Sequence, residues 1–306
     1  MTSEWLPDGA TIRAQGLIAL RPLALSATPS HALAALPGGF PTRRKGAGLE
    51  PADVREYVPG DDIRTMDRGA TARTGTLHVR LFREERDRVA LLVADFRPQM
   101  FWGLKRAFRS VAAAEILSLI GWQVVESGGR VGLLAVSSEG LVVVPPRARV
   151  RGMLDVIRGM VDSHRAGLGA LAAARSPGDT RLDHALLRAE RLVPSGSEIF
   201  VASGFDRPGP DLGDNLAALS RRRRLSLMLV TSGPGGRLPQ GLYPVRLEDG
   251  RRMRLRVTGD GLGDGSGGSD EVRIVGGHRA AVIDAGLPVE TIAARLAGGG
   301  LREAAA

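Results

Sequence analysis

Runs of apolar residues alternate with amphipathic stretches through the middle of this 306-residue chain. Residues 89–95 form an unbroken apolar run that ends on Asp95, a pattern typical of a strand buried on both faces of a parallel sheet. Similar patterns predict strands at 131–137, 141–144, 198–205 and 225–231, and helices at 105–126, 147–164, 182–193 and 211–222. This alternation predicts an α/β fold: a mainly parallel sheet with helices on both faces.

The pattern divides the chain into four parts. Residues 1–40 are rich in Ala, Leu and Pro, and are expected to form a short packed arm or to be partly disordered. Residues 41–86 are a charged segment, which we call the hallmark segment, and 87–233 carry the α/β pattern. Gly233-Pro234-Gly235-Gly236 marks the start of an extension over 234–306. It is predicted to contain a hairpin (243–247 with 253–257), a flexible Gly-rich loop at 259–270, and a helix at 289–297.

Composition narrows the function classes. The chain has no cysteine, which excludes disulfides, thiolate metal sites and a cysteine nucleophile. Its net charge of +9 comes almost wholly from Arg, since Lys45 and Lys105 are the only lysines. Coding bias is the favoured explanation, and an Arg-rich nucleic-acid-binding protein is the alternative. The one compact basic run, 221–224, has no aromatic neighbour for base stacking, so nucleic acid is the less favoured partner.

The chain has no run of 18 uncharged apolar residues, so no transmembrane helix is expected. Its beginning does not match a secretory signal, because Glu4 precedes any basic residue and Arg21 interrupts the apolar stretch. The expected location is the cytoplasm, with the periphery of the inner membrane as the alternative.

Residues 48–88 carry the most informative pattern. It is made of ordered Arg and Asp residues around a Pro-Gly-Asp-Asp turn, followed by an acidic run: Arg55, Tyr57, Pro59, Gly60, Asp61, Asp62, Arg64, Asp67, Ala72, Arg73, Glu84, Glu85 and Arg86. This order resembles the bacterial family called domain of unknown function 58; Met66 and Arg68 depart from its usual Ile and Trp. The resemblance implies a von Willebrand factor type A-like domain and a MoxR-type AAA+ ATPase partner. In methylotrophs, relatives accompany methanol dehydrogenase maturation, including metal insertion.

Asp95 follows the first strand, at the sheet edge where α/β folds bind ligands. In metal-binding type A domains this position opens an Asp-x-Ser-x-Ser motif, completed by a later Thr and Asp. Here Arg97 and Gln99 replace the two serines, Thr180 is the candidate threonine, and Gly204 stands where the later acid is expected. Arg97 beside a divalent cation would be strongly unfavourable. A non-metal site is therefore favoured, with Arg97 pairing with Asp95 and offering donors to a partner carboxylate.

The Pro59-Gly60-Asp61-Asp62 turn has two interpretations. It is either a turn followed by helix capping, which is favoured, or a recognition loop whose acids meet basic residues of the ATPase. Arg55, Arg64 and Arg73 are expected to pair with Asp62, Asp67, Glu84 and Glu85, and the segment is expected to pack on the sheet.

Enzyme motifs are largely missing. The sequence contains no GxxxxGK[ST], HExxH or GxSxG motif, and its five histidines lack metal-ligand spacing. We therefore expect a non-enzymatic adaptor without metal or cofactor, which works with the ATPase in assembling or maturing a client protein.

Overall fold

The structure, a computed structural model, describes residues 9–26, 51–59, 61–82, 88–173, 180–232, 240–246, 251–258 and 272–297. The chain divides into two compact units. Gly39–Asp87 form the small unit, and Met1–Gly38 with Arg88–Ala306 form the large unit.

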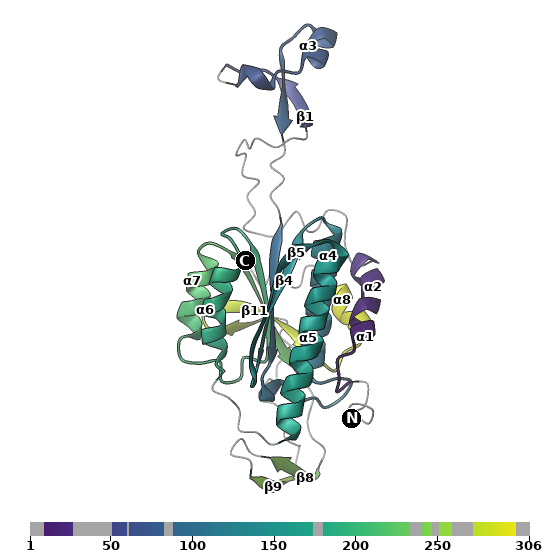
Figure 1. Cartoon of the computed structure of the whole chain (residues 1–306), viewed down its shortest axis with the longest axis vertical. Helices are drawn as coiled ribbons and strands as arrows, with labels where there is room; N and C mark the ends of the chain where they lie inside the picture. The colour runs from purple at the N-terminus through teal and green to yellow at the C-terminus, as the bar shows by residue number, and fades with distance from the viewer. Residues whose placement is uncertain are drawn as a thin grey trace. The chain divides into compact units, whose positions relative to one another are not determined.

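The large unit is built on a seven-stranded sheet in the order β10-β11-β7-β6-β3-β4-β5 (Figure 1). The strands are β3 (Val89–Phe96), β4 (Arg130–Ser137), β5 (Gly140–Ala148), β6 (Glu198–Ser203), β7 (Arg224–Thr231), β10 (Val272–Val275) and β11 (His278–Asp284). The five inner strands are parallel, whereas β5 and β10 pair antiparallel at the two edges. The predicted α/β class is therefore confirmed, and the arrangement is consistent with a type A-like fold.

Helices cover both faces of this sheet, and β3 contributes to both cores (Figure 1). Leu92, Ala94 and Phe96 belong to the core beneath α4 (Arg109–Glu126) and α5 (Arg149–Ala172). Leu91 and Val93 belong to the core beneath α6 (Leu182–Leu192) and α7 (Leu212–Ser220). A strand with helices on both sides has no solvent-facing row, which explains the unbroken apolar run in the sequence.

The N-terminal arm packs on the α4 side of the sheet. It contains α1 (Ala14–Ala19) and α2 (Arg21–Ser26), whose buried residues join the core of α4. Trp122 Nε1 on α4 donates a hydrogen bond of 3.1 Å to the Leu17 carbonyl, and Arg21 pairs with Glu126 at 2.8 Å. Residues 9–26 therefore follow the packed alternative rather than the disordered one.

The C-terminal extension contributes two strands to the sheet that the sequence did not predict. β11 pairs parallel with β7, and β10 pairs with β11 as an edge strand. The sheet therefore extends beyond residue 233, and α8 (Val289–Ala297) joins the same core as α1 and α4. Two other predictions concern this region and α5. The hairpin is present as β8 (Gly241–Arg246) with β9 (Arg252–Val257), and α5 continues to Ala172, beyond the helix end predicted at residue 164. The predicted loop at 259–270 lies outside the described residues.

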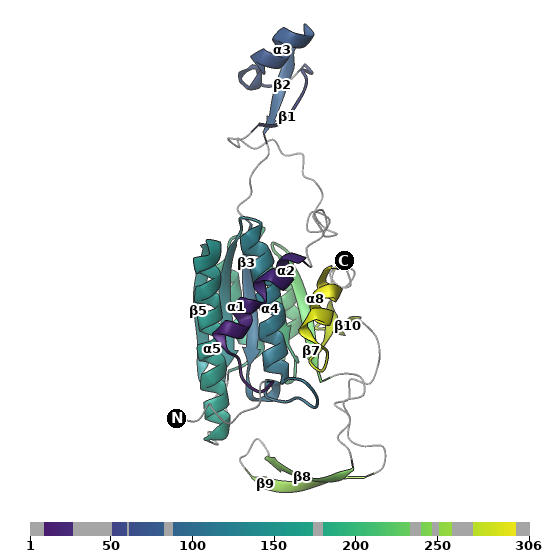
Figure 2. The same ribbon diagram turned by 90° about the vertical axis from the view of Figure 1, so that its right-hand side faces the viewer.

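The small unit is an antiparallel ribbon with two short helices (Figure 2). Its strands are β1 (Pro51–Glu56) and β2 (His78–Phe82), which pair from Pro51↔Phe82 to Glu56↔His78. Between them lie the 3-10 helix η2 (Ile63–Thr65) and α3 (Arg68–Thr74). Gly75 ends α3 in the left-handed conformation (φ +75°), which glycine adopts without steric cost.

None of the helices in the described part of the chain is both long enough and apolar enough to cross a bilayer.

Candidate functional site

The carboxyl ends of β3 and β6 bring Asp95 and Ser203 together at one edge of the sheet. β3 and β6 are neighbouring parallel strands, so their last residues meet at the same edge. The Ser203 hydroxyl donates a hydrogen bond of 2.6 Å to Asp95 Oδ2 and accepts one of 2.8 Å from the Phe205 amide. Both side chains are buried, so any charge on Asp95 must be balanced from within the protein.

That balance comes from Arg97, whose guanidinium binds Asp95 in a bidentate pair. Arg97 Nε lies 2.9 Å from Asp95 Oδ1, and Nη2 lies 2.8 Å from Oδ2. The Arg97 backbone amide also donates to Oδ1, at 3.0 Å. Arg97 is only 4% exposed. Burial alone would lower the pKa of Arg97, but the Asp95 carboxylate outweighs it and holds that pKa above its ordinary value.

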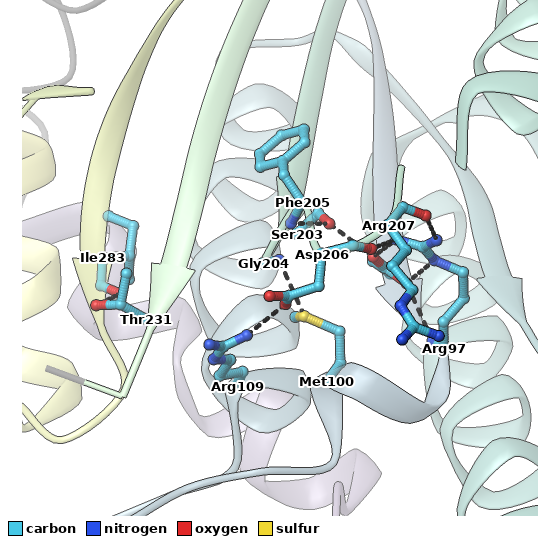
Figure 3. Close-up of polar contacts among 11 residues, drawn as sticks. Arg97, Met100, Arg109, Ser203, Gly204, Phe205, Asp206, Arg207, Thr231 and Ile283 are labelled. Carbon is cyan, nitrogen blue, oxygen red and sulfur yellow. Dashed lines mark hydrogen bonds and ion pairs between the residues drawn. The ribbon is translucent and has the colours of Figure 1, made fainter. Parts of the chain in front are cut away.

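The other side of the same guanidinium holds the loop that follows β6. Arg97 Nη1 donates to the Arg207 carbonyl at 2.9 Å, and Nη2 donates to the Asp206 carbonyl at 3.1 Å (Figure 3). Phe205 and Arg207 have φ angles of 51° and 44°, in the left-handed region that non-glycine residues rarely adopt. The buried guanidinium therefore ties a strained loop to the end of β3, and the loop conformation depends on it.

A second arginine neutralises the carboxylate of this loop. Arg109, the first residue of α4, contacts Asp206 Oδ2 through Nη1 at 2.5 Å. Gly204 makes room for this pair: a Cβ there would lie 2.5 Å from Asp206 Oδ2 and 2.6 Å from Arg109 Nη1. Its amide donates to Met100 Sδ at 3.0 Å. The carboxylate expected at position 204 is thus replaced by one from position 206, which arrives with its own arginine.

These residues do not fit a divalent cation. Asp95 already accepts four hydrogen bonds, three of them from Arg97, and a cation at the carboxylate would have to displace a positive charge that is locked in place. The prediction that Arg97 pairs with Asp95 is confirmed. The prediction that Arg97 offers donors to a partner carboxylate is wrong, because Arg97 is buried and its donors are turned inward onto Asp95 and the loop carbonyls.

In the small unit the acids of the Pro-Gly-Asp-Asp turn serve local structure. Asp61 accepts from Arg55 Nη2 at 2.7 Å and from the Val58 amide at 3.0 Å. Asp62 caps η2 through the Arg64 amide, and Asp67 caps α3 through the Ala70 amide. These contacts support the turn-and-cap interpretation over a recognition loop built on the two acids.

Comparison with known proteins gives one matching family. The model of the family described as "Protein of unknown function DUF58" matches residues 53–254, which span most of the small unit and the sheet from β3 to β7. The chain belongs to this family. It is also 36% identical over 138 residues to uncharacterized proteins of Mycobacterium tuberculosis and Mycobacterium bovis. That match covers 42% of this chain and 42% of the length of those relatives.

In this DUF58 member, the other residues predicted at the sheet edge, Thr180 and Gln99, make no hydrogen bond to Asp95 within the described structure. Thr180 lies just before α6, and among the described residues no hydrogen bond joins it to Asp95. Gln99 lies in the 3-10 helix η3 (Pro98–Met100), and its buried Oε1 has no hydrogen-bond partner in the described structure. Ser203 and Arg109 are partners of the site that were not predicted from the sequence. Only the Ser-Gly-Phe-Asp run at the end of β6 pointed to the first of them.

The pairs expected in the hallmark segment also need correction. Arg55 pairs with Asp61 and not with Asp62 or Asp67, because the latter two carboxylates face backbone amides at helix starts. The Arg64 and Arg73 side chains are exposed and pair with no acid within the described residues. The amide of Tyr57 donates to the Leu77 carbonyl at 2.7 Å, and Pro59 stands in the turn closed by the Asp61 amide on the Val58 carbonyl. Gly60, Glu84 and Glu85 lie outside the described residues.

Two other polar clusters have little catalytic potential. Ser110 Oγ and His164 Nε2 lie 3.1 Å apart, but both residues are buried. The His164 ring packs edge-on against Phe96 and Phe101. Burial lowers the pKa of His164 to about 4. Asp183, His184 and Asp211 come close enough to share a cation, yet Arg181 already binds both carboxylates. Burial alone would raise the pKa of Asp183; hydrogen bonds from Arg181 and backbone amides outweigh it and lower that pKa.

Proposed function

We propose that this chain is a non-enzymatic interaction protein. The observation that carries the proposal is the internal neutralisation of the sheet edge where this topology normally places ligands. Asp95 is bound by Arg97 and Ser203, and Asp206 is bound by Arg109. A catalytic acid or base needs a side chain that can reach a substrate and exchange a proton, and these carboxylates are committed to buried or partly buried arginines.

We further propose that it works with a MoxR-type AAA+ ATPase in assembling or maturing a client protein. The support is the family resemblance carried by the hallmark segment together with membership of DUF58. One candidate task is metal insertion into methanol dehydrogenase. The proposed location is the cytoplasm or the periphery of the inner membrane.

The test is direct binding between the purified chain and the purified MoxR-type ATPase encoded in the same genome. Biolayer interferometry is run with ATP, ADP and a non-hydrolysable ATP analogue, because AAA+ surfaces change with nucleotide. We expect saturable binding in at least one nucleotide state. The absence of binding in all three states would overturn the ATPase partnership.

A nucleic-acid-binding role is the second candidate, favoured by the net charge of +9 and by exposed arginines such as Arg221 and Arg222. Retention on heparin and on single-stranded DNA over a salt series separates the two proposals. Phosphate binding weakens steeply with salt, roughly in proportion to the number of contacts. Retention that survives in high salt, or none at low salt, would argue against this role.

A further inference from the structure

The end of the large unit opposite to the Asp95 site carries an excess of arginine. It is the end at which β3, β4, β6 and β7 begin and at which α4, α6 and α7 terminate. β5 runs antiparallel to β4, with Ala148 opposite Arg130, so α5 begins at this end too. We call it the amino end of the sheet. Helix termini from both faces of the sheet therefore meet there (Figure 1).

The acids described at the amino end already have arginine partners. The pairs are Arg21–Glu126 at 2.8 Å, Arg147–Asp155 at 2.9 Å, Arg223–Glu190 at 3.5 Å and Arg88–Glu198 at 2.9 Å. Glu198 also contacts a second arginine, Arg224, at 3.6 Å. Within the described residues, no carboxylate of this end is left to neutralise a further arginine.

Five exposed arginines of the same end have no ion-pair partner within the described part of the chain. We define the arginine end as these side chains: Arg149, Arg151, Arg191, Arg221 and Arg222. The first two lie in the first turn of α5, Arg191 lies in the last turn of α6, and the last two follow α7. From β5 to β7 the sheet covers four strand spacings, so these side chains are spread over about 20 Å.

Helix stability explains only part of this arrangement. A cation at the end of α6 or α7 interacts favourably with the helix dipole, so Arg191 and Arg221 stabilise their own helices. The first turn of α5 is the opposite case, because a helix N-terminus disfavours positive charge. Arg149 and Arg151 therefore weaken the helix that carries them. An anionic partner that binds these two cations would offset this cost.

Arg223 fixes the ends of α6 and α7 relative to each other. It is buried, and its Nη2 donates to the carbonyls of Glu190 at 2.6 Å and Val193 at 3.0 Å. The Gly196 amide also donates to the Arg222 carbonyl at 2.7 Å. The backbone segments that carry the arginines of α6 and α7 are thus held together before any partner binds, so binding does not have to order them.

We propose that the arginine end binds the surface of a membrane that contains anionic phospholipids. A bilayer of this kind presents a broad layer of phosphate groups, which matches cations spread over both faces of the sheet. Each basic residue near such a surface contributes about fivefold to the affinity. The inference goes beyond the ATPase partnership. It rests on the proposed function only in the location at the periphery of the inner membrane, to which it gives a contact surface.

Other partners fit the arginine end less well. A protein interface normally has an apolar centre from which charged residues are depleted. Leu154 and Leu187 are the exposed apolar side chains closest in sequence to these arginines, and both lie further from the helix ends. Single-stranded nucleic acid needs aromatic side chains for stacking. The only exposed aromatic side chain among the described residues is Trp102, which follows η3 at the carboxyl end. Reading a duplex needs a helix or ribbon that enters a groove, whereas the arginine end is made of helix termini.

The experiment measures sedimentation of the purified full chain with vesicles. One vesicle preparation contains phosphatidylcholine alone, and the other contains phosphatidylcholine with an equal amount of phosphatidylglycerol. The first variant is Arg149→Glu with Arg151→Glu. Its matched control, Arg158→Glu with Arg165→Glu, reverses two exposed arginines further along the same helix. Both change the net charge equally, so a difference between them reports position.

The first variant also separates loss of binding from loss of folding. It places acids in the first turn of α5, where negative charge is favourable, so it should stay folded. A second variant neutralises the arginines of the other face: Arg191→Gln with Arg221→Gln and Arg222→Gln. Its control neutralises three exposed cations away from the amino end: Lys105→Gln with Arg158→Gln and Arg165→Gln. Circular dichroism checks that all four proteins are folded.

We expect the wild-type chain to bind the anionic vesicles and not the neutral ones, and its binding to weaken as salt rises and screens the charges. Each arginine-end variant should raise the lipid concentration needed for half-maximal binding at least about tenfold, with both controls within about twofold of the wild type.

Three outcomes would overturn the inference. The first is no binding of the wild-type chain to anionic vesicles at low salt, or equal binding to both vesicle types. The second is equal binding by the arginine-end variants and their controls. The third is tighter, salt-sensitive binding of duplex DNA that the same variants lose, which would assign the arginine end to nucleic acid. Each of these outcomes leaves the ATPase partnership standing, because interferometry with the purified ATPase decides it separately.

Discussion

Replacing Arg97 by alanine is the most direct test of the Asp95–Arg97 pair at the carboxyl end of β3. In Arg97→Ala, Asp95 stays buried and keeps only the Ser203 hydroxyl and the amide of residue 97 as donors. The carbonyls of Asp206 and Arg207 also lose their donors. Leaving one partner of a buried ion pair uncompensated typically costs about 3–5 kcal/mol. We expect a loss of that size in the free energy of unfolding of the large unit.

A double-mutant cycle then separates the pair from its surroundings. Asp95→Ala with Arg97→Ala leaves no buried charge, so the double variant should be no less stable than Arg97→Ala alone. Residues in direct contact typically couple by about 0.5–3 kcal/mol. Arg97→Lys keeps the charge but loses the two parallel hydrogen bonds, and should fall between wild type and Arg97→Ala.

Urea unfolding followed by circular dichroism gives these free energies. Arg158→Ala is the control, because Arg158 pairs with Asp162 at 3.7 Å on the exposed side of α5 and should change stability by less than about 1 kcal/mol. If Arg97→Ala were no more destabilising than Arg158→Ala, Asp95 and Arg97 would not form a buried pair, and the account of the site would be wrong.

Three further predictions follow from the same region. Calorimetry with Mg²⁺ or Mn²⁺ should detect no site at Asp95 tighter than about 100 µM, a level at which about 1 mM cation would stabilise by only about 1.4 kcal/mol; a tighter site that disappears in Asp95→Ala would contradict this. The pKa of His164 lies at about 4 in the folded protein, so the unfolded state binds the extra proton. Stability should be complete above about pH 6.5 and fall by up to about 3 kcal/mol between pH 6.5 and 4, and His164→Gln should lose that slope in pH-dependent denaturation. Gly204→Asp should lower the free energy of unfolding by about 1–3 kcal/mol, because its Cβ collides with the Arg109–Asp206 pair; unchanged thermal stability would show that the pair moves aside freely.

Local patterns predicted most of the fold because each depends on neighbours in the chain. The unbroken apolar run of β3 and the helical periodicity of α6 each reflect burial within one element. β11 escaped prediction because its place in the sheet comes from pairing with β7, about fifty residues earlier, and β10 in turn pairs with β11. Such long-range pairing leaves only a weak signal in the local sequence.

The sequence by itself determined the α/β class, the family resemblance, and the departure of Arg97, Gln99 and Gly204 from a metal-binding pattern. Only the tertiary structure decided what those departures do. The direction of the Arg97 side chain depends on the loop after β6, whose carbonyls lie more than a hundred residues away in the chain. The absence of a side chain at Gly204 is explained by the Arg109–Asp206 pair, because α4 brings Arg109 to the place that a Cβ would occupy. Side-chain direction and burial are set by such distant neighbours, and the spacing of residues along the chain does not encode them.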